Sequence, residues 1–297
     1  MSEVIKSERV RLPPEAALIG ITMLWGGTFL IIKTALAQGG AVGLVGFRFG
    51  LGALLLAVIT RPGWPTRREW VGGFCIGAAL FAGYGLQALG LTTIASSRSA
   101  FFTALYVPLV PLLQYVFLRK PPGWSGFAGA VLAFAGLVLL SHPSGMVLHF
   151  STGDLLTIAC AVGCAIEIIL LGHFAPDCNA QRLAVVEMGV VALLSLVFTS
   201  AAGAGIPWHF WPFWIWTGVL GVATSLIMFA QAWGQARVPA LRATLIYAME
   251  PVWAGIVGAV AGDAMGWETL LGAGLIFAAV LVDAVKKLVP VRGQPLI

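Results

Sequence analysis

The sequence predicts an all-α integral membrane protein with ten transmembrane helices, arranged as two inverted five-helix repeats. Three observations lead to this prediction: an apolar composition, long apolar runs and a duplicated pattern. Hydrophobic residues make up 59% of the 297 residues and charged residues only 10%, and the mean hydropathy is +0.95. Soluble proteins carry about 25% charged residues. The apolar runs are continuous, whereas the strands of a membrane β-barrel alternate apolar and polar residues.

The long apolar runs are the predicted transmembrane helices, which we number as spans 1 to 10. A helix that crosses the hydrocarbon core needs about 20 mostly apolar residues, and each run is close to that length. Turn residues, charges or both separate one run from the next. The spans cover residues 15–37, 41–60, 69–92, 96–118, 123–141, 152–172, 180–202, 210–235, 239–261 and 267–288.

Basic residues predict the orientation of these spans. Cytoplasmic loops of membrane proteins are enriched in lysine and arginine. With a cytoplasmic N-terminus, the inner segments hold 13 of the 17 basic residues, which are Lys6, Arg9, Arg11, Arg61, Arg67, Arg68, Arg119, Lys120, Arg182, Arg237, Lys286, Lys287 and Arg292. Both termini are therefore predicted to be cytoplasmic and the number of spans to be even. The net positive charge reflects this topology, so we expect no nucleic-acid partner.

A duplicated pattern relates the two halves of the chain. The segment 87–111 recurs at 231–251, where Gln, Ala, Gly and Arg reappear with the same spacing. Residues 50–58 recur in the same way at 189–197, at nearly the same offset. In both matches, a span of the first half aligns with the span five positions later in the chain. A unit with an odd number of spans must enter the membrane from the opposite face when it is repeated, and many secondary transporters use such inverted repeats for alternating access.

The residues also resemble a known family. The resemblance lies in L-W-G-G-T-F at 24–29, in a turn of small residues before span 4, and in the Glu250–Pro251 step of span 9. With the five-plus-five arrangement, these features resemble the EamA type of the drug/metabolite transporter (DMT) superfamily, and are most similar to bacterial inner-membrane exporters of amino acids and related metabolites. The resemblance implies two EamA-like repeats, 1–147 and 148–297, and net export. Val107–Pro108 stands where the second-half pattern has Glu–Pro.

Polar and aromatic side chains within the predicted spans are candidates for a substrate cavity. Polar groups are costly in hydrocarbon and therefore face a cavity or another helix. The repeat relates span 3 to span 8 and span 4 to span 9, so their polar faces are expected to converge on one pocket. The alternative for each residue is interhelical hydrogen bonding or packing. The candidates are Trp25, Tyr84, Gln87, Ser99, Phe102, Thr103, Tyr106, Thr224, Met228, Gln231, Thr244 and Tyr247.

Two acidic residues and three prolines complete the candidate site. Glu167 and Glu250 lie near the middle of their spans, where burial favours a neutral carboxyl. They are candidate proton carriers or binders of a substrate ammonium, and the alternative is a structural hydrogen bond. Pro108, Pro111 and Pro251 each free a backbone carbonyl of the preceding turn. They are candidate hinges, and the alternative is a static kink.

A further pair of intramembrane charges, Arg48 and Glu187, occupies equivalent positions in the two repeats. Each lies well inside its span. The inversion separates the two residues by about 9 Å along the membrane normal. We therefore expect no direct ion pair between them.

The sequence predicts no catalytic, metal or cofactor site. The four histidines fall in predicted loops without H-E-x-x-H spacing, which would mark a zinc hydrolase. The four cysteines lack a C-x-x-C pair and are expected to pack as small apolar residues. No phosphate-binding loop of the G-x-x-x-x-G-K-[ST] type occurs, so we expect neither an enzyme nor an ATP-driven pump.

The function expected from these features is secondary transport. We expect export of small amphipathic metabolites, above all amino acids including aromatic and neutral ones, across the bacterial inner membrane by alternating access around a central cavity between the repeats. The expected partners are this small-molecule substrate, the lipid bilayer and protons as the candidate coupling ion, in a monomer or homodimer. Transport of nucleosides, nucleotide sugars or drugs is the main alternative, followed by a channel or scramblase.

Overall fold

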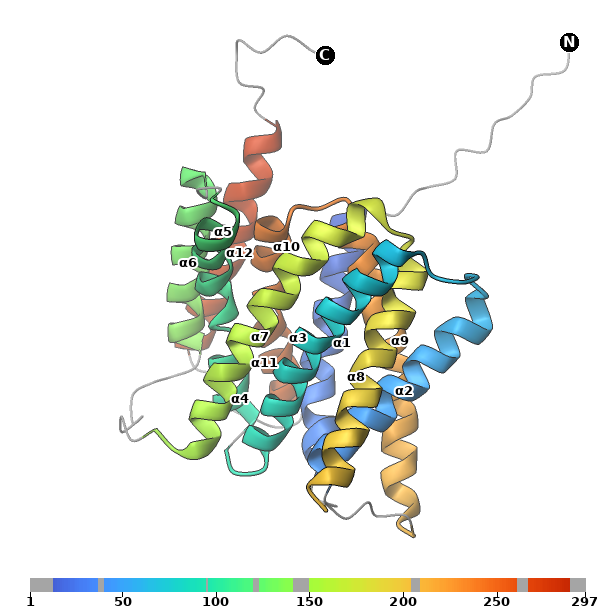
Figure 1. Cartoon of the computed structure of the whole chain (residues 1–297). Coiled ribbons are helices and arrows are strands. Elements are labelled where there is room, and N and C mark those ends of the chain that lie inside the picture. The colour runs from blue at the N-terminus through green and yellow to red at the C-terminus, as the bar shows by residue number, and fades with distance from the viewer. Residues whose placement is uncertain are drawn as a thin grey trace, which may run out of the picture.

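The computed structural model describes residues 13–36, 40–94, 96–119, 123–140, 150–203, 209–260 and 267–288, and within these ranges the regular structure is helical. The helices pack into one bundle (Figure 1). They are α1 (Pro14–Leu36), α2 (Ala41–Thr60), α3 (Arg67–Leu91), α4 (Ser96–Thr103), α5 (Tyr106–Leu118), α6 (Trp124–Leu140), α7 (Thr152–Phe174), the 3-10 turn η1 (Ala175–Asp177), α8 (Ala180–Ala201), α9 (Trp211–Gln235), α10 (Ala240–Tyr247), α11 (Glu250–Val260) and α12 (Trp267–Leu288).

The helix boundaries agree closely with the apolar runs of the sequence. Most of the predicted spans correspond to one helix each, with nearly the same ends. The other two spans, 96–118 and 239–261, are each divided into two helices. The basic residues predicted at the two chain ends, from Lys6 to Arg11 and at Arg292, lie outside the described residues.

The helices have the length and composition of membrane-spanning segments. Within the described ranges, six segments are long and apolar enough to cross a membrane, namely 41–60, 67–91, 98–117, 152–177, 180–201 and 211–235. Two shorter apolar helical segments, 126–139 and 270–281, accompany them. Large apolar side chains such as Leu54 and Leu193, 60% and 63% exposed, cover the outside of the bundle. Such a surface is unfavourable in water and favourable in lipid, so the all-α membrane class is confirmed.

Polar residues at helix starts explain where α3 and α7 begin. The Thr66 hydroxyl accepts a hydrogen bond from the Glu69 N–H, and the Glu69 carboxylate accepts one from the Thr66 N–H. Ser151 and Asp154 form the same reciprocal capping box at the start of α7. Each box satisfies backbone donors that a helix N-terminus leaves without a partner. Both capping carboxylates also contact other helices.

The two divided spans break at equivalent positions. Ala104–Leu105 separates α4 from α5, and Ala248–Met249 separates α10 from α11. The sequence offset that relates Gln87 to Gln231 also relates these two breaks. Pro108 and Pro251 follow these breaks near the starts of α5 and α11, where proline has no N–H to offer to the preceding turn. The Ala104 carbonyl is not left free, because it accepts a hydrogen bond of 3.0 Å from the Val107 N–H.

Pro111 behaves differently from the other two prolines. It lies inside α5, which continues beyond it to Leu118. Neighbouring groups in a packed bundle can compensate for the missing hydrogen bond. The helical ribbon therefore continues through Pro111, and the division of span 4 lies before Pro108.

Glycines allow α8 to approach its neighbours closely. A Cβ atom added at Gly73 would lie 2.5 Å from a Val186 side-chain carbon, and one added at Gly77 would lie 2.6 Å from the Glu187 carbonyl oxygen. Gly46 of α2 also faces α8, where an added Cβ would lie 2.9 Å from Leu196. Small residues at such interfaces let helix backbones pack by van der Waals contact.

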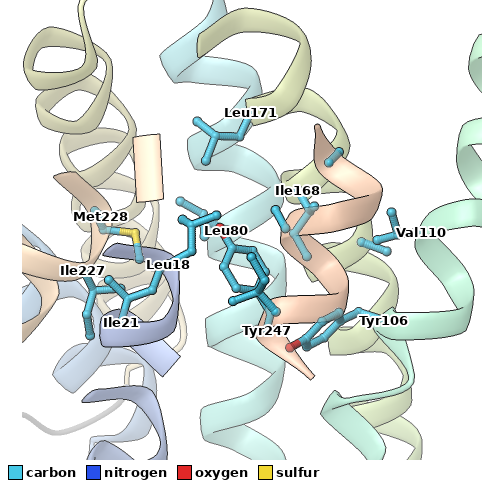
Figure 2. Packing of buried hydrophobic residues seen from close by; sticks show 14 of the residues in the cluster. Leu18, Ile21, Leu80, Tyr106, Val110, Ile168, Leu171, Ile227, Met228 and Tyr247 are labelled. Carbon is cyan, nitrogen blue, oxygen red and sulfur yellow. The ribbon is translucent and has the colours of Figure 1, made fainter. Parts of the chain in front are cut away.

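The centre of the bundle is a mixed aliphatic and aromatic core. Figure 2 shows Leu18 from α1 near Met228 and Ile227 from α9, with Leu80 between them and Tyr247. Its members come from both halves of the chain. Leu80, Tyr106, Ile168 and Tyr247 of this core also line the cavity described next.

Candidate functional site

A small cavity lies in the centre of the bundle. It offers about 50 Å³ of space for water-sized molecules. Its walls come from both halves of the chain and from both helix breaks. The lining residues are Trp25, Thr28, Ile32, Leu80, Gly83, Tyr84, Gln87, Thr103, Tyr106, Cys160, Cys164, Glu167, Ile168, Gln231, Tyr247 and Glu250.

Many of the residues predicted for the site line this cavity. They are Trp25, Tyr84, Gln87, Thr103, Tyr106, Glu167, Gln231, Tyr247 and Glu250. Tyr106 and Glu250 are the first residues of α5 and α11, so both follow directly after a helix break. The cavity therefore lies beside both helix breaks, where α5 and α11 begin.

The other cavity candidates are buried but do not line the cavity. They are Ser99, Phe102, Thr224, Met228 and Thr244. The Thr244 hydroxyl donates a hydrogen bond of 2.8 Å to the Ala240 carbonyl of its own helix, and Met228 belongs to the apolar core in Figure 2. These two side chains have the packing role that was the alternative for each candidate.

A chain of hydrogen bonds joins α7, α9 and α10 at the cavity wall. Gln231 Nε2 donates to Glu167 Oε1 over 3.1 Å, and Gln235 Nε2 donates to the Ile168 carbonyl over 3.0 Å. The Tyr247 hydroxyl donates to Gln235 Oε1, also over 3.0 Å. These side chains are buried, and the bonds give their amide and hydroxyl donors partners inside the bundle.

A second glutamine has a similar place in the first half of the chain. Gln87 Nε2 on α3 donates a hydrogen bond of 3.1 Å to the Thr103 hydroxyl on α4. The same sequence offset relates Gln87 to Gln231 and Thr103 to Tyr247. Two related glutamines thus face the same cavity from different helices.

Aromatic rings form much of the remaining wall. The rings of Trp25 and Tyr247 meet edge to face with centroids 5.1 Å apart, and those of Tyr84 and Phe49 meet at 5.0 Å. Edge-to-face pairs hold aromatic side chains in a defined orientation. The cavity therefore offers rigid apolar faces beside carboxyl, amide and hydroxyl groups.

Ion pairs join the two halves of the chain at opposite ends of the bundle. Arg98 of α4 contacts Asp154 of α7 through two hydrogen bonds, 2.6 and 2.8 Å long. Arg242 of α10 lies 3.9 Å from Glu15 of α1. Figure 1 shows α4 and the start of α7 toward the lower end of the bundle, and α10 and the start of α1 toward the upper end. The first pair is thus closed more tightly than the second.

Cys160 and Cys164 also border the cavity, although their sequence pattern suggested packing alone. Their sulfur atoms lie 3.8 Å apart and both thiols are free. Among the described residues, no group of three His, Cys, Asp or Glu side chains is placed to hold a metal ion.

Comparison with known proteins identifies the family. The model of the EamA-like transporter family matches the chain twice, at residues 13–142 and 151–283. The chain belongs to the EamA-like transporter family. It is therefore a multi-pass membrane transporter, with a small-molecule substrate and the lipid bilayer as partners.

Two known proteins are similar to this chain. An uncharacterized transporter of Archaeoglobus fulgidus is 28% identical over 287 residues, which cover 93% of this chain and 87% of that protein. A protein of known crystal structure superposes with a TM-score of 0.76 at 18% identity, over 94% of this chain and 99% of the other. The second similarity shows the fold.

A larger groove on the outside of the transporter has a different character. It encloses about 870 Å³ between α2, α3 and α8, and apolar residues such as Leu54 and Leu193 line it. Trp64, Trp70 and Arg182 also border the groove. Its lining matches the lipid-facing surface, so the central cavity is the better candidate for the solute of an EamA-family protein.

Sequence reasoning missed several residues of the site. Thr28 and Ile32 line the cavity from α1. Thr28 is related to Glu167 by the offset that places residues 50–58 on 189–197, so the repeat itself could have identified it. Gln235 was not missed, because its spacing of one helical turn from Gln231 places both amides on the polar face of span 8, and it accepts the hydrogen bond of the Tyr247 hydroxyl.

Proposed function

We propose that this EamA-family protein is a secondary transporter that exports amino acids, including aromatic and neutral ones, across the bacterial inner membrane by alternating access. The observation that carries the proposal is the composition of the central cavity. Glu167 and Glu250 offer acidic groups for an ammonium, and Trp25, Tyr84 and Tyr247 offer rings for an apolar side chain. Such a combination suits an amphipathic solute.

The size of the cavity supports a mechanism in which the protein changes conformation. A single water molecule needs roughly 10–15 Å³ of such space, so a cavity of about 50 Å³ holds only a few waters. An amino acid fits only after the surrounding helices separate. The conformation described here therefore corresponds to a contracted state of the transport cycle.

The equivalence of the two ends supports an inverted arrangement of ten spans in two repeats, 1–147 and 148–297. Arg98 and Arg242 are related by the offset that places Gln87 on Gln231. Their partners, Glu15 and Asp154, are related by the offset that places residues 50–58 on 189–197. A twofold axis in the membrane plane would exchange the pairs, and alternating access follows when one opens while the other closes.

Basic residues suggest which end faces the cytoplasm. Arg61, Arg67, Arg68 and Arg182 lie at the ends of α2, α3 and α8, and in this proposal they face the cytoplasm together with both chain termini. The pair Arg98–Asp154 then closes the periplasmic end, and Arg242–Glu15 lies at the cytoplasmic end. The tighter periplasmic pair agrees with a state that is closer to opening inward.

The divided helices are the proposed hinges of the two gates. Each break precedes a proline, Pro108 or Pro251, and ends beside a cavity residue, Tyr106 or Glu250. A short interruption can absorb a change in backbone angles without unwinding either half-helix. Pro111 remains a candidate hinge within α5.

Protons are the proposed coupling ion. Glu167 and Glu250 are buried acidic residues of the cavity, and Gln231 holds the Glu167 side chain in place. A carboxyl that releases its proton when the substrate ammonium binds would couple the movement of protons to the transport of the substrate.

The test is uptake into proteoliposomes that contain the purified protein. The panel comprises amino acids, nucleosides and nucleotide sugars, each measured with and without an imposed pH gradient. Saturable, counterflow-stimulated uptake of amino acids supports the proposal. Strict nucleotide-sugar exchange would assign another substrate class, and unsaturated flux would indicate a channel or scramblase.

A further inference from the structure

Arg48 is a buried cation without a carboxylate partner. Its side chain is 4% exposed on α2, and its Nε atom is buried without a hydrogen-bond partner. Among the described residues it forms neither a hydrogen bond nor an ion pair. Glu187, at the equivalent position of the repeat, is also buried, and the two side chains form no ion pair.

The guanidinium group contacts aromatic rings instead. Its central carbon lies 4.8 Å from the ring centre of Tyr84 and 5.1 Å from that of Phe49. Cation–π contacts of this kind offset only part of the cost of placing an unpaired charge inside a membrane bundle. Intramembrane charges of this kind are commonly functional, and their expected partner is an opposite charge.

Tyr84 connects Arg48 to the transport cavity. The Tyr84 ring lines the cavity and also packs against the guanidinium group. Arg48 itself does not line the cavity in this contracted conformation. A rotation of Tyr84 about its side-chain bonds would therefore remove the group that stands between Arg48 and the solute.

We propose that Arg48 binds the carboxylate of the transported amino acid when Tyr84 turns aside, while Glu167 and Glu250 interact with its ammonium group. This inference rests on the proposed function and adds the recognition of the anionic end of the solute. The planar guanidinium matches a carboxylate through two parallel hydrogen bonds. The cavity would then carry acidic groups for one end of a zwitterion and a basic group for the other.

The decisive experiment compares an amino acid with the same molecule lacking its carboxylate. Phenylalanine and phenethylamine compete for uptake of labelled phenylalanine by the wild-type protein and by Arg48→Gln. In the wild type, phenethylamine should compete about 10- to 100-fold more weakly, as expected for the loss of a charge-assisted contact. In Arg48→Gln, phenylalanine should weaken to the level of phenethylamine, and phenethylamine should be unaffected.

A surface arginine provides the matched control. Arg68→Gln removes an exposed arginine that pairs with Asp177 away from the cavity, and it should keep the wild-type preference. An unchanged preference for phenylalanine in Arg48→Gln would overturn the inference alone. Absence of any amino-acid uptake by the wild type would overturn the proposed function as well, so the two failures are distinguishable.

A second measurement uses the wild-type protein and does not depend on the folding of a variant. Phenylglyoxal modifies accessible guanidinium groups, and peptide mass spectrometry reports the modification of Arg48. Phenylalanine should protect Arg48 at concentrations at which phenethylamine does not. No modification of Arg48, or equal protection by both compounds, would overturn the inference.

Discussion

Arg98 and Asp154 tie the two halves of the chain together at one end of the bundle. Asp154 is fully buried, and its carboxylate accepts hydrogen bonds from Arg98 and from the Ser151 N–H and hydroxyl. The related pair, Arg242 and Glu15, is longer and more exposed at its carboxylate. Both ends of the bundle therefore carry an arginine–carboxylate pair, and the Arg98–Asp154 pair is the shorter one, with the more buried carboxylate.

Removing the tight ion pair should destabilise the transporter more than removing the loose one. Arg98→Gln leaves the buried Asp154 carboxylate with Ser151 alone, which should cost about 2–3 kcal/mol after allowance for the partly exposed arginine. Arg242→Gln should cost less, about 1 kcal/mol, because its contact with Glu15 is longer, at 3.9 Å, and the Glu15 carboxylate is 35% exposed. Thermal unfolding in detergent measures both variants, and equal losses would contradict the assignment of one closed and one loose pair.

The cavity glutamine should matter for transport more than a buried threonine outside the cavity. Gln231→Leu removes the donor to Glu167 and should reduce amino-acid uptake by about tenfold or more, since a buried polar group then lacks its partner. Thr244→Val removes a hydroxyl that bonds to its own helix and should keep near wild-type uptake. Similar uptake by the two variants would show that this cavity is not the transport site.

Proton coupling should depend on at least one acidic residue of the cavity. Glu167→Gln and Glu250→Gln each keep the shape of the side chain and remove its ability to release a proton. The expected result is uptake that no longer responds to an imposed pH gradient in one or both variants. If both variants retain the pH response of the wild type, neither residue carries the coupling proton.

The helix breaks should control the rate of conformational change. Pro108→Ala and Pro251→Ala restore a backbone N–H, which favours a continuous helix across each break. Both variants should have a lower turnover number at saturating substrate, with a smaller effect on substrate affinity. Turnover that is unchanged in both variants would remove the hinge proposal and leave the breaks as static features.

Two glycines, Gly77 on α3 and Gly189 on α8, should respond in opposite ways to alanine. Gly77→Ala places a methyl group 2.6 Å from the Glu187 carbonyl oxygen and should destabilise the fold by about 1–3 kcal/mol. Gly189→Ala, on α8, meets no atom within 4 Å and should be neutral or stabilising by up to about 1 kcal/mol, because alanine favours helix. Unfolding temperatures in detergent test the pair.

Helix positions and several site residues could be predicted because their signals are local. Long apolar runs define the spans by length alone, and proline marked the divided helices around Pro108 and Pro251. The repeat offset related Gln87 to Gln231, and both glutamines do line the cavity. Helical periodicity was less reliable for Ser99 and Thr244, because a buried face can point toward another helix as readily as toward a cavity.

The sequence by itself determined the membrane class, most of the helix boundaries and the relation between the halves, since hydrophobic length and internal similarity do not depend on how helices pack. Only the tertiary structure decided which polar faces meet. It joined Glu167 to Gln231, brought Arg98 to Asp154 and left Arg48 against Tyr84. Those pairings depend on the rotation and separation of helices distant in the chain, which are fixed by close packing at residues such as Gly77 and not by the periodicity of any one segment.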